Sequence, residues 1–224
     1  MRRISFFAIM LVLVLVAIMS FSSQVFGQGG SKVLMIPREG YSGDLDLMLK
    51  MELGVMNLLL KSAGFQVDIA TTSGFPIVGN TEKIPKLSRL VDIKLDDYKG
   101  VIMPCMAVGG FPGPPISPEA VAIVKKALAD GKPVAASTFS VIILADAGLL
   151  KGKKYAFPRD PLKTDANFTL TDLRFEGANY AGRGVVQDGK IITSGICANL
   201  EKVNAYQSGT IELTEKLIAA IGPK

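Results

Sequence analysis

Hydrophobic positions near the start of the chain alternate between short apolar runs and one longer periodic stretch. Residues 32–37 form an apolar run that ends at a proline, which predicts a buried strand. The next stretch is apolar at helical spacing and ends at Gly64, which favours a helix terminus. Its predicted buried face consists of Met48, Met51, Val55, Leu58 and Leu59. Residues 65–70 alternate and predict a second strand, so the chain opens with a right-handed strand–helix–strand unit.

The second half of the chain continues this alternation. Residues 72–98 lack clear periodicity and are expected to form a loop with one short strand. Residues 100–104 and 133–136 predict two more buried strands, and Ser117-Pro118-Glu119 between them has the form of a helix start. A buried helix is expected over residues 139–147, which are apolar nearly all round.

The C-terminal part shows a hairpin signal followed by a helical pattern. Asp188-Gly189 predicts a tight turn within residues 184–194, and residues 199–221 predict a helix that Ser208-Gly209 can break. The whole pattern predicts an α/β fold, a three-layer sandwich with a mostly parallel central sheet. No linker divides the region, so residues 28–224 are expected to form a single domain.

The N-terminus has the pattern of an export signal. Arg2 and Arg3 precede an apolar stretch over residues 5–21, and small residues follow at Val25 and Gly27. Cleavage after Gly27 would remove residues 1–27 and leave a periplasmic or extracellular protein. The alternative is an uncleaved segment in which residues 5–21 anchor the protein to the membrane.

Composition narrows the chemistry. Apolar residues make up 49% of the chain and charged residues 20%, which is typical of a globular protein. The formal net charge of +5 is dispersed, so we expect no nucleic-acid partner. The chain contains no histidine, which excludes a histidine base and the commonest metal ligand. A zinc site would need Cys105, Cys197 and carboxylates, and their spacing does not indicate one, so we expect neither metal nor cofactor.

Candidate chemistry lies where the predicted parallel strands end, because ligands bind beyond the carboxyl ends of such strands. Three segments reach that edge: residues 105–110, 137–139 and 195–198. The middle segment resembles a nucleophile elbow, in which a strand ends in small residues and a buried helix begins at once. Such a turn exposes one side chain, here Thr138, at a helix N-terminus that stabilises an anion.

Several motifs around this turn occur in a known order. They are Lys132-Pro133-Val134-Ala135-Ala136-Ser137-Thr138, the later segment 147–154, Glu52 twelve residues before Gly64, and segments 97–104 and 188–194. In order and spacing the chain resembles the ThiJ/PfpI family of the class I glutamine-amidotransferase-like superfamily, over about residues 32–221. The resemblance implies a flavodoxin-like fold and a homodimer.

The chain departs from this family at the positions that carry its chemistry. Thr138 stands at the family's cysteine, and Phe139 and Phe157 stand where members place a histidine. The family's Pro-Gly-Gly oxyanion turn becomes Pro104-Cys105-Met106. A threonine hydroxyl gains little from a helix N-terminus and needs a strong base. The alternative is that Thr138 merely caps its helix.

Glu52 remains where the resemblance places the partner of the elbow residue. It lies on the apolar face of the first predicted helix, between Met48 and Met56. An ionised carboxylate there needs partners or a raised pKa. It is expected either to hydrogen-bond Thr138 or a ligand, or to accept hydrogen bonds from backbone N–H groups at the rim of the sheet; a third reading places it in solvent.

The resemblance brings the loops of Cys105 and Cys197 close to the elbow. In an oxidising compartment the two could form a disulfide. The alternatives are two buried thiols, or one reactive thiol displaced from the usual position.

Three functions follow from these readings. The leading hypothesis is an exported domain without the family's cysteine catalysis, which binds a small molecule or a protein partner at the strand-edge pocket. Its expected binding residues are Glu52, Cys105, Met106, Thr138, Phe139, Phe157 and Cys197. The alternative, implied by the family, is a hydrolase or a carbonyl-modifying enzyme of the glyoxalase, deglycase or peptidase kind, which uses Thr138 or a cysteine with Glu52. A pocket filled by Phe139 and Phe157 would instead indicate a structural or interaction module.

Overall fold

The computed structural model describes residues 31–39, 45–105, 116–166, 169–198, 203–204 and 207–222. The predictions for residues 1–27, for Met106 and for the first part of the C-terminal helix, residues 199–206, lie wholly or partly outside these ranges. None of the helices in the described ranges is both long and apolar enough to cross a membrane.

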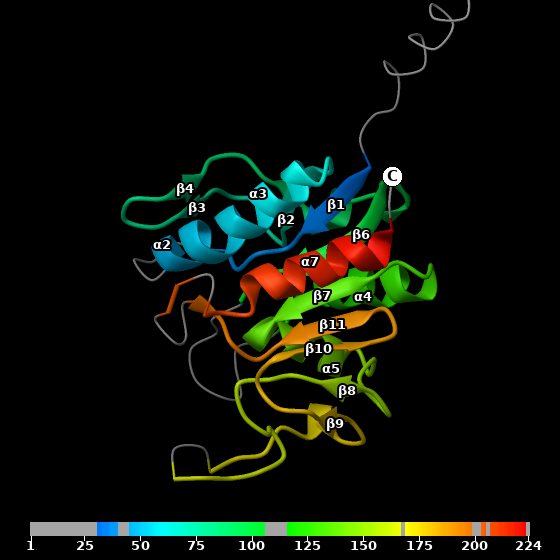
Figure 1. Ribbon diagram of the computed structural model, residues 1–224. Coiled ribbons are helices and arrows are strands. Elements are labelled where there is room, and N and C mark those ends of the chain that lie inside the picture. The colour runs from blue at the N-terminus through cyan, green and yellow to red at the C-terminus, as the bar shows by residue number, and fades with distance from the viewer. Residues whose placement is uncertain are drawn as a thin grey trace, which may run out of the picture. The chain divides into compact units, whose positions relative to one another are not determined.

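A seven-stranded sheet forms the centre of the domain, in the order β10-β11-β7-β6-β1-β2-β5 (Figure 1). Its strands are β1 (Lys32–Met35), β2 (Gln66–Thr71), β5 (Ser88–Arg89), β6 (Tyr98–Met103), β7 (Val134–Ser137), β10 (Val185–Asp188) and β11 (Ile191–Ser194). All neighbours run parallel except β10, which pairs antiparallel with β11. Counting the five inner strands in chain order gives 2-1-3-4-5, the flavodoxin-like arrangement, and this confirms the predicted fold class.

Helices cover both faces of this sheet and complete the three layers. One face carries α2 (Leu45–Leu47), η1 (Met48–Leu53), α3 (Gly54–Ser62) and α7 (Thr210–Ile221). The other carries α4 (Pro118–Ala129), η4 (Thr138–Ser140) and α5 (Val141–Asp146). Successive residues of β1 feed the two cores in turn: Val33 packs with the first layer and Leu34 with the second. A central strand that is buried on both faces has a continuous apolar sequence, and Val33, Leu34 and Met35 of β1 form such a run.

The remaining elements are short. They are β3 (Ile77–Val78), β4 (Lys83–Ile84), β8 (Lys154–Tyr155), β9 (Asn179–Tyr180) and the 3₁₀ turns η2 (Leu90–Asp92), η3 (Leu95–Asp97) and η5 (Leu173–Phe175). The expected single strand within residues 72–98 is therefore three, of which β5 extends the main sheet beside β2.

Local signals place several elements as predicted. The Ser117 side chain accepts a hydrogen bond from the Ala120 N–H, and Pro118 begins α4. Gly189 turns the β10–β11 hairpin with a φ of 62°, and Gly64 ends α3 with a φ of 85°. Glycine adopts these left-handed conformations without the steric cost that a Cβ imposes.

The predicted buried face of the first helix is wrong in part. Leu58 is 64% exposed, whereas Leu53 and Leu60 are buried. The cause is the π-helical segment η1, which precedes α3. A π-helical turn holds more residues than an α-helical turn, so the pattern extrapolated at 3.6 residues per turn loses its phase.

The last helix begins at Thr210, directly after Gly209. Ser208-Gly209 therefore marks the start of this helix, and Val203 and Asn204 are not helical.

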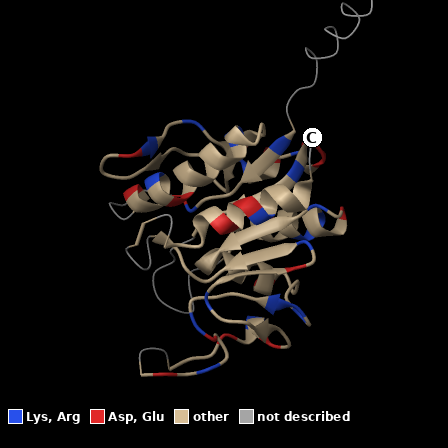
Figure 2. Ribbon diagram, in the orientation of Figure 1, with Lys and Arg blue, Asp and Glu red and all other residues tan. Residues whose placement is uncertain are grey.

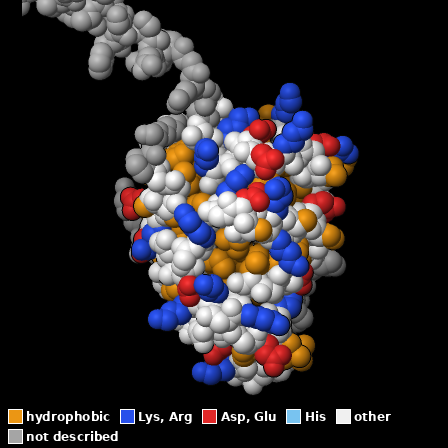
Figure 3. All heavy atoms as spheres, turned by 90° about the vertical axis from the view of Figure 1, so that its right-hand side faces the viewer, with side chains coloured by type: hydrophobic (Ala, Val, Ile, Leu, Met, Phe, Trp, Pro, Cys, Tyr) orange, Lys and Arg blue, Asp and Glu red, His pale blue; other side chains and the backbone are white. Residues whose placement is uncertain are grey.

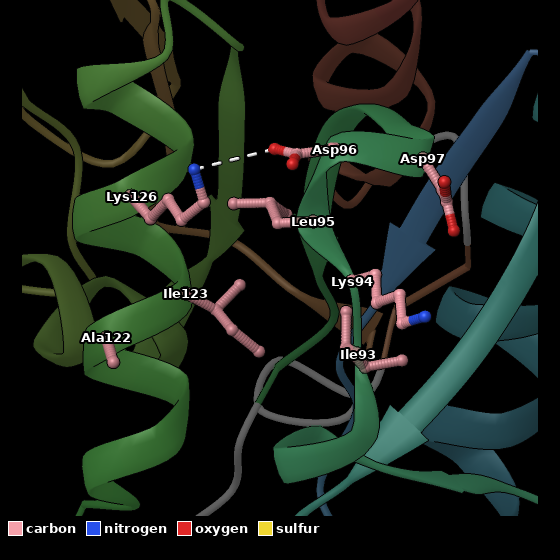
Figure 4. A pocket seen from close by; sticks show the side chains of 8 residues that line it. All are labelled: Ile93, Lys94, Leu95, Asp96, Asp97, Ala122, Ile123 and Lys126. Atoms are coloured by element: carbon pink, nitrogen blue, oxygen red, sulfur yellow. Dashed lines mark ion pairs between the residues drawn. The ribbon is translucent and has the colours of Figure 1, made fainter.

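A cavity of about 460 Å³ lies at the amino-terminal edge of the sheet, opposite the elbow. It separates the segment just before β6 from α4, and Leu95 and Ile123 point into it beneath an ion pair of 3.5 Å between Lys126 and Asp96 (Figure 4).

Charged side chains of both signs are scattered over helices and loops (Figure 2). Hydrophobic side chains gather at the centre of one face, with basic ones spaced around them (Figure 3).

Candidate functional site

The candidate residues come from four segments at the carboxyl edge of the sheet. Glu52 lies in η1 after β1, Cys105 follows β6, Thr138 follows β7, and Cys197 follows β11. The strands in question are adjacent in the order β11-β7-β6-β1. The predicted convergence of Cys105, Thr138 and Cys197 on one edge therefore agrees with the observed topology.

Thr138 forms the elbow. Its φ of 46° is the only positive value among the described non-glycine residues. A β-branched residue in this region is strained by about 1–3 kcal/mol, and such strain is typical of a nucleophile elbow. The backbone thus keeps a geometry that a threonine by itself disfavours.

The hydroxyl of Thr138 makes no hydrogen bond of regular geometry among the described residues, although the side chain is fully buried and lies beside the Cys105 thiol. It therefore does not cap the helix, and the alternative prediction that Thr138 serves as a helix cap is wrong. Nor does the hydroxyl bond Glu52, so no base among the described residues activates it.

Glu52 is fully buried, which excludes the reading that placed it in solvent. Its Oε2 accepts a hydrogen bond of 2.8 Å from the backbone N–H of Cys105. This agrees with a carboxylate satisfied by backbone N–H groups at the sheet rim. Glu52 thereby ties the first helical segment to the end of β6.

Cys105 and Cys197 meet at Glu52. One donor atom from each of the three residues lies within 4.8 Å of the other two, and all three side chains are buried. Both cysteines are thiols in this structure. The structure therefore agrees with the alternative of two buried thiols. A disulfide between them in an oxidising compartment stays a prediction.

The pKa of the Cys105 thiol is raised well above its usual value. The largest cause is its hydrogen bond with Cys197, followed by burial and by the negative charge of Glu52, while the nearby Thr138 hydroxyl lowers the pKa in part. The thiolate is the nucleophilic form of cysteine. Cys105 is therefore a poor nucleophile at neutral pH.

We expect Cys105 of the native, reduced protein to resist iodoacetamide at pH 8, because the thiol is buried and protonated. Unfolding in urea should restore the reactivity of an ordinary cysteine. Peptide mass spectrometry after timed quenching measures both rates. Native labelling of Cys105 as fast as in urea would contradict the prediction.

Two phenylalanines pack against each other beside the elbow. The rings of Phe139 and Phe157 pack edge to face with centroids 5.7 Å apart. Phe157 is 1% exposed and Phe139 is half-buried. The two positions where the family resemblance expects a histidine thus form a hydrophobic contact.

Ser140 was missed by the sequence reasoning. It is fully buried, and its Oγ donates a hydrogen bond to the Pro104 carbonyl. This bond ties the turn after Thr138 to the end of β6, beside Cys105. The available signal was a hydroxyl within the otherwise apolar stretch 139–147.

Solved structures share this architecture. A ThiJ/PfpI domain protein from Brachyspira murdochii superposes with a TM-score of 0.60 at 16% identity, over 86% of this chain and 98% of the other. A DJ-1 superfamily protein from Agrobacterium tumefaciens gives a TM-score of 0.61 at 15% identity, over 86% and 90%. The fold is therefore the flavodoxin-like, class I glutamine-amidotransferase-like sandwich.

The chain belongs to the DJ-1/PfpI family, whose model matches residues 45–204. It is 31% identical over 140 residues to an uncharacterised protein of Methanocaldococcus jannaschii, covering 61% of this chain and 63% of that one. It is 29% identical over 167 residues to a protein named as a deglycase from Thermococcus kodakarensis, covering 73% and 89%.

Proposed function

We propose that this protein is an exported DJ-1/PfpI domain that does not perform cysteine catalysis and that binds a ligand or partner at the carboxyl edge of its sheet. The observation that carries the proposal is the state of the elbow. Thr138 keeps the strained backbone, yet its buried hydroxyl has no base as a partner.

The other groups at the site support the same conclusion. Glu52 accepts a hydrogen bond from the Cys105 backbone, and the pKa of the Cys105 thiol is raised. A covalent mechanism needs a nucleophile and a base in hydrogen-bond reach of each other. At the elbow position that carries the family's nucleophile, the Thr138 hydroxyl does not have this arrangement with Glu52.

A deglycase-like activity is the second candidate, and the relative from Thermococcus kodakarensis favours it. It would require Thr138 or a cysteine to react with a carbonyl compound while Glu52 transfers a proton. That mechanism requires the site to open, as binding of a larger ligand at these residues also does, because Glu52, Thr138 and Cys197 are fully buried.

Turnover of methylglyoxal, a nitrophenyl ester and casein tests the two candidates. We expect no rate above the uncatalysed background from the native protein. Thr138→Ala and Glu52→Gln should leave that result unchanged, as should Glu176→Gln, a matched carboxylate change at an exposed position. A substrate whose turnover is lost in Thr138→Ala or Glu52→Gln, and kept in Glu176→Gln, would establish the enzyme instead.

A further inference from the structure

Glu52, Cys105 and Cys197 present two sulfur donors and one oxygen donor to a single buried point. We propose that these residues bind a thiophilic divalent metal ion of the zinc class. The inference deepens the proposed function, on which it rests, because it names the chemical class of ligand that the closed site takes.

The donor set fits this class of ion. Zinc is bound in proteins by thiolates and carboxylates, usually in tetrahedral geometry. Hard ions such as magnesium and calcium prefer oxygen alone, whereas two thiolates favour zinc and its softer neighbours. Both thiols lose their protons to solvent when the ion binds.

The distances are also close to what an ion needs. Bonds of about 2.0–2.3 Å to a tetrahedral zinc place neighbouring donor atoms about 3.5–3.8 Å apart. The three donors lie within 4.8 Å of one another. The donor atoms must therefore approach one another by up to about 1 Å to share one ion.

Thr138 supplies an independent observation. Its Oγ1 is fully buried and makes no hydrogen bond of regular geometry among the described residues, and its one polar contact is with the Cys105 thiol, whose pKa it lowers. A buried polar atom without a partner is costly, and each such atom in a native structure calls for an explanation. A metal ion beside Cys105 would give this oxygen a partner.

The scaffold holds the donors before any ion arrives. The bond from the Cys105 N–H to Glu52 fixes the carboxylate, one oxygen of which lies within 4.8 Å of both sulfurs. Ser140 fixes the end of β6 through the Pro104 carbonyl. Because all three donors are buried, the arrangement is closer to a closed structural site than to an open catalytic one.

Cobalt(II) is the probe, since its spectrum reports both geometry and thiolate bonding. The full chain is kept in mild detergent with a non-thiol reductant, stripped with a chelator and titrated with cobalt. We expect one equivalent to bind, with tetrahedral visible bands and a thiolate-to-cobalt band in the near ultraviolet. One equivalent of zinc should then abolish both.

Variants locate the ion. Cys105→Ser and Cys197→Ser should lose most of the thiolate band, and Glu52→Gln should weaken binding by at least about tenfold. Glu176→Gln, exposed on the surface, should bind as the native protein does. Should a serine variant not fold, the native spectrum alone decides, because the near-ultraviolet band reports sulfur bound to cobalt.

Absence of stoichiometric binding, or binding without a thiolate band, would overturn the metal site. Recovery of Cys105 and Cys197 as a disulfide that reductant does not reverse would overturn it too. Turnover measured on the same metal-free samples separates the two proposals. No uptake and no turnover would overturn the metal site alone, whereas turnover that Thr138→Ala abolishes would overturn the proposed function whether or not cobalt binds.

Discussion

Replacement of Phe157 with alanine is expected to lower the free energy of unfolding by about 3–5 kcal/mol. Phe157 is 1% exposed, and its ring packs on Phe175 and Phe139 with centroid distances of 5.0 and 5.7 Å. Truncation removes these contacts and leaves a cavity that the surrounding strands and loops can only partly fill. Urea unfolding followed by circular dichroism measures the loss.

Phe75→Ala is the matched control. Phe75 is 69% exposed, so the same truncation should change the free energy of unfolding by no more than about 0.5 kcal/mol. Equal effects of the two substitutions would show that Phe157 is not part of the packed core beside the elbow.

The second large effect is expected from Gly195→Ala. A Cβ at this position would lie 2.5 Å from the backbone carbon and oxygen of Phe157 and 2.9 Å from the Cα of Arg183. Backbone atoms cannot rotate away, so the loop that leads to Cys197 must move. We expect a loss of about 3 kcal/mol, at the upper end of the range for overpacked sites.

Gly184→Ala provides the comparison, because a Cβ there meets no atom within 4 Å. Alanine at this position should be neutral or stabilising by up to about 1 kcal/mol, since it restricts the unfolded chain. Thermal unfolding of both variants tests the pair. A Gly195→Ala protein as stable as the Gly184→Ala protein would contradict the close approach of this loop to Phe157.

The fold could be predicted from the sequence because its local signals agree with one another. Apolar runs mark the buried strands, Ser117 and Pro118 mark the start of α4, and Asp188-Gly189 marks the hairpin turn. The predictions fail where the residue pattern no longer follows regular helix or strand periodicity. The π-helical segment shifts the phase of the first helix and exposes Leu58. The edge strand β5 has only two residues, too few for any periodic signal.

The site was predictable in part. Position and order in the chain indicated Thr138 as the elbow and Glu52 as a buried carboxylate, and the structure has both. The meeting of Cys105 with Cys197 depends on the adjacency of β6, β7 and β11, which spacing along the chain does not encode. For this reason the spacing of the cysteines did not indicate a metal site, although the structure brings both sulfurs to Glu52.

The rate of methylglyoxal conversion by the native protein, measured beside Thr138→Ala, tests the central claim most directly. The claim is that the elbow keeps its strained backbone without an activated nucleophile. Native and variant proteins are predicted to be indistinguishable from the uncatalysed background. A native rate well above background that falls to background in Thr138→Ala would contradict the claim and make this protein an enzyme.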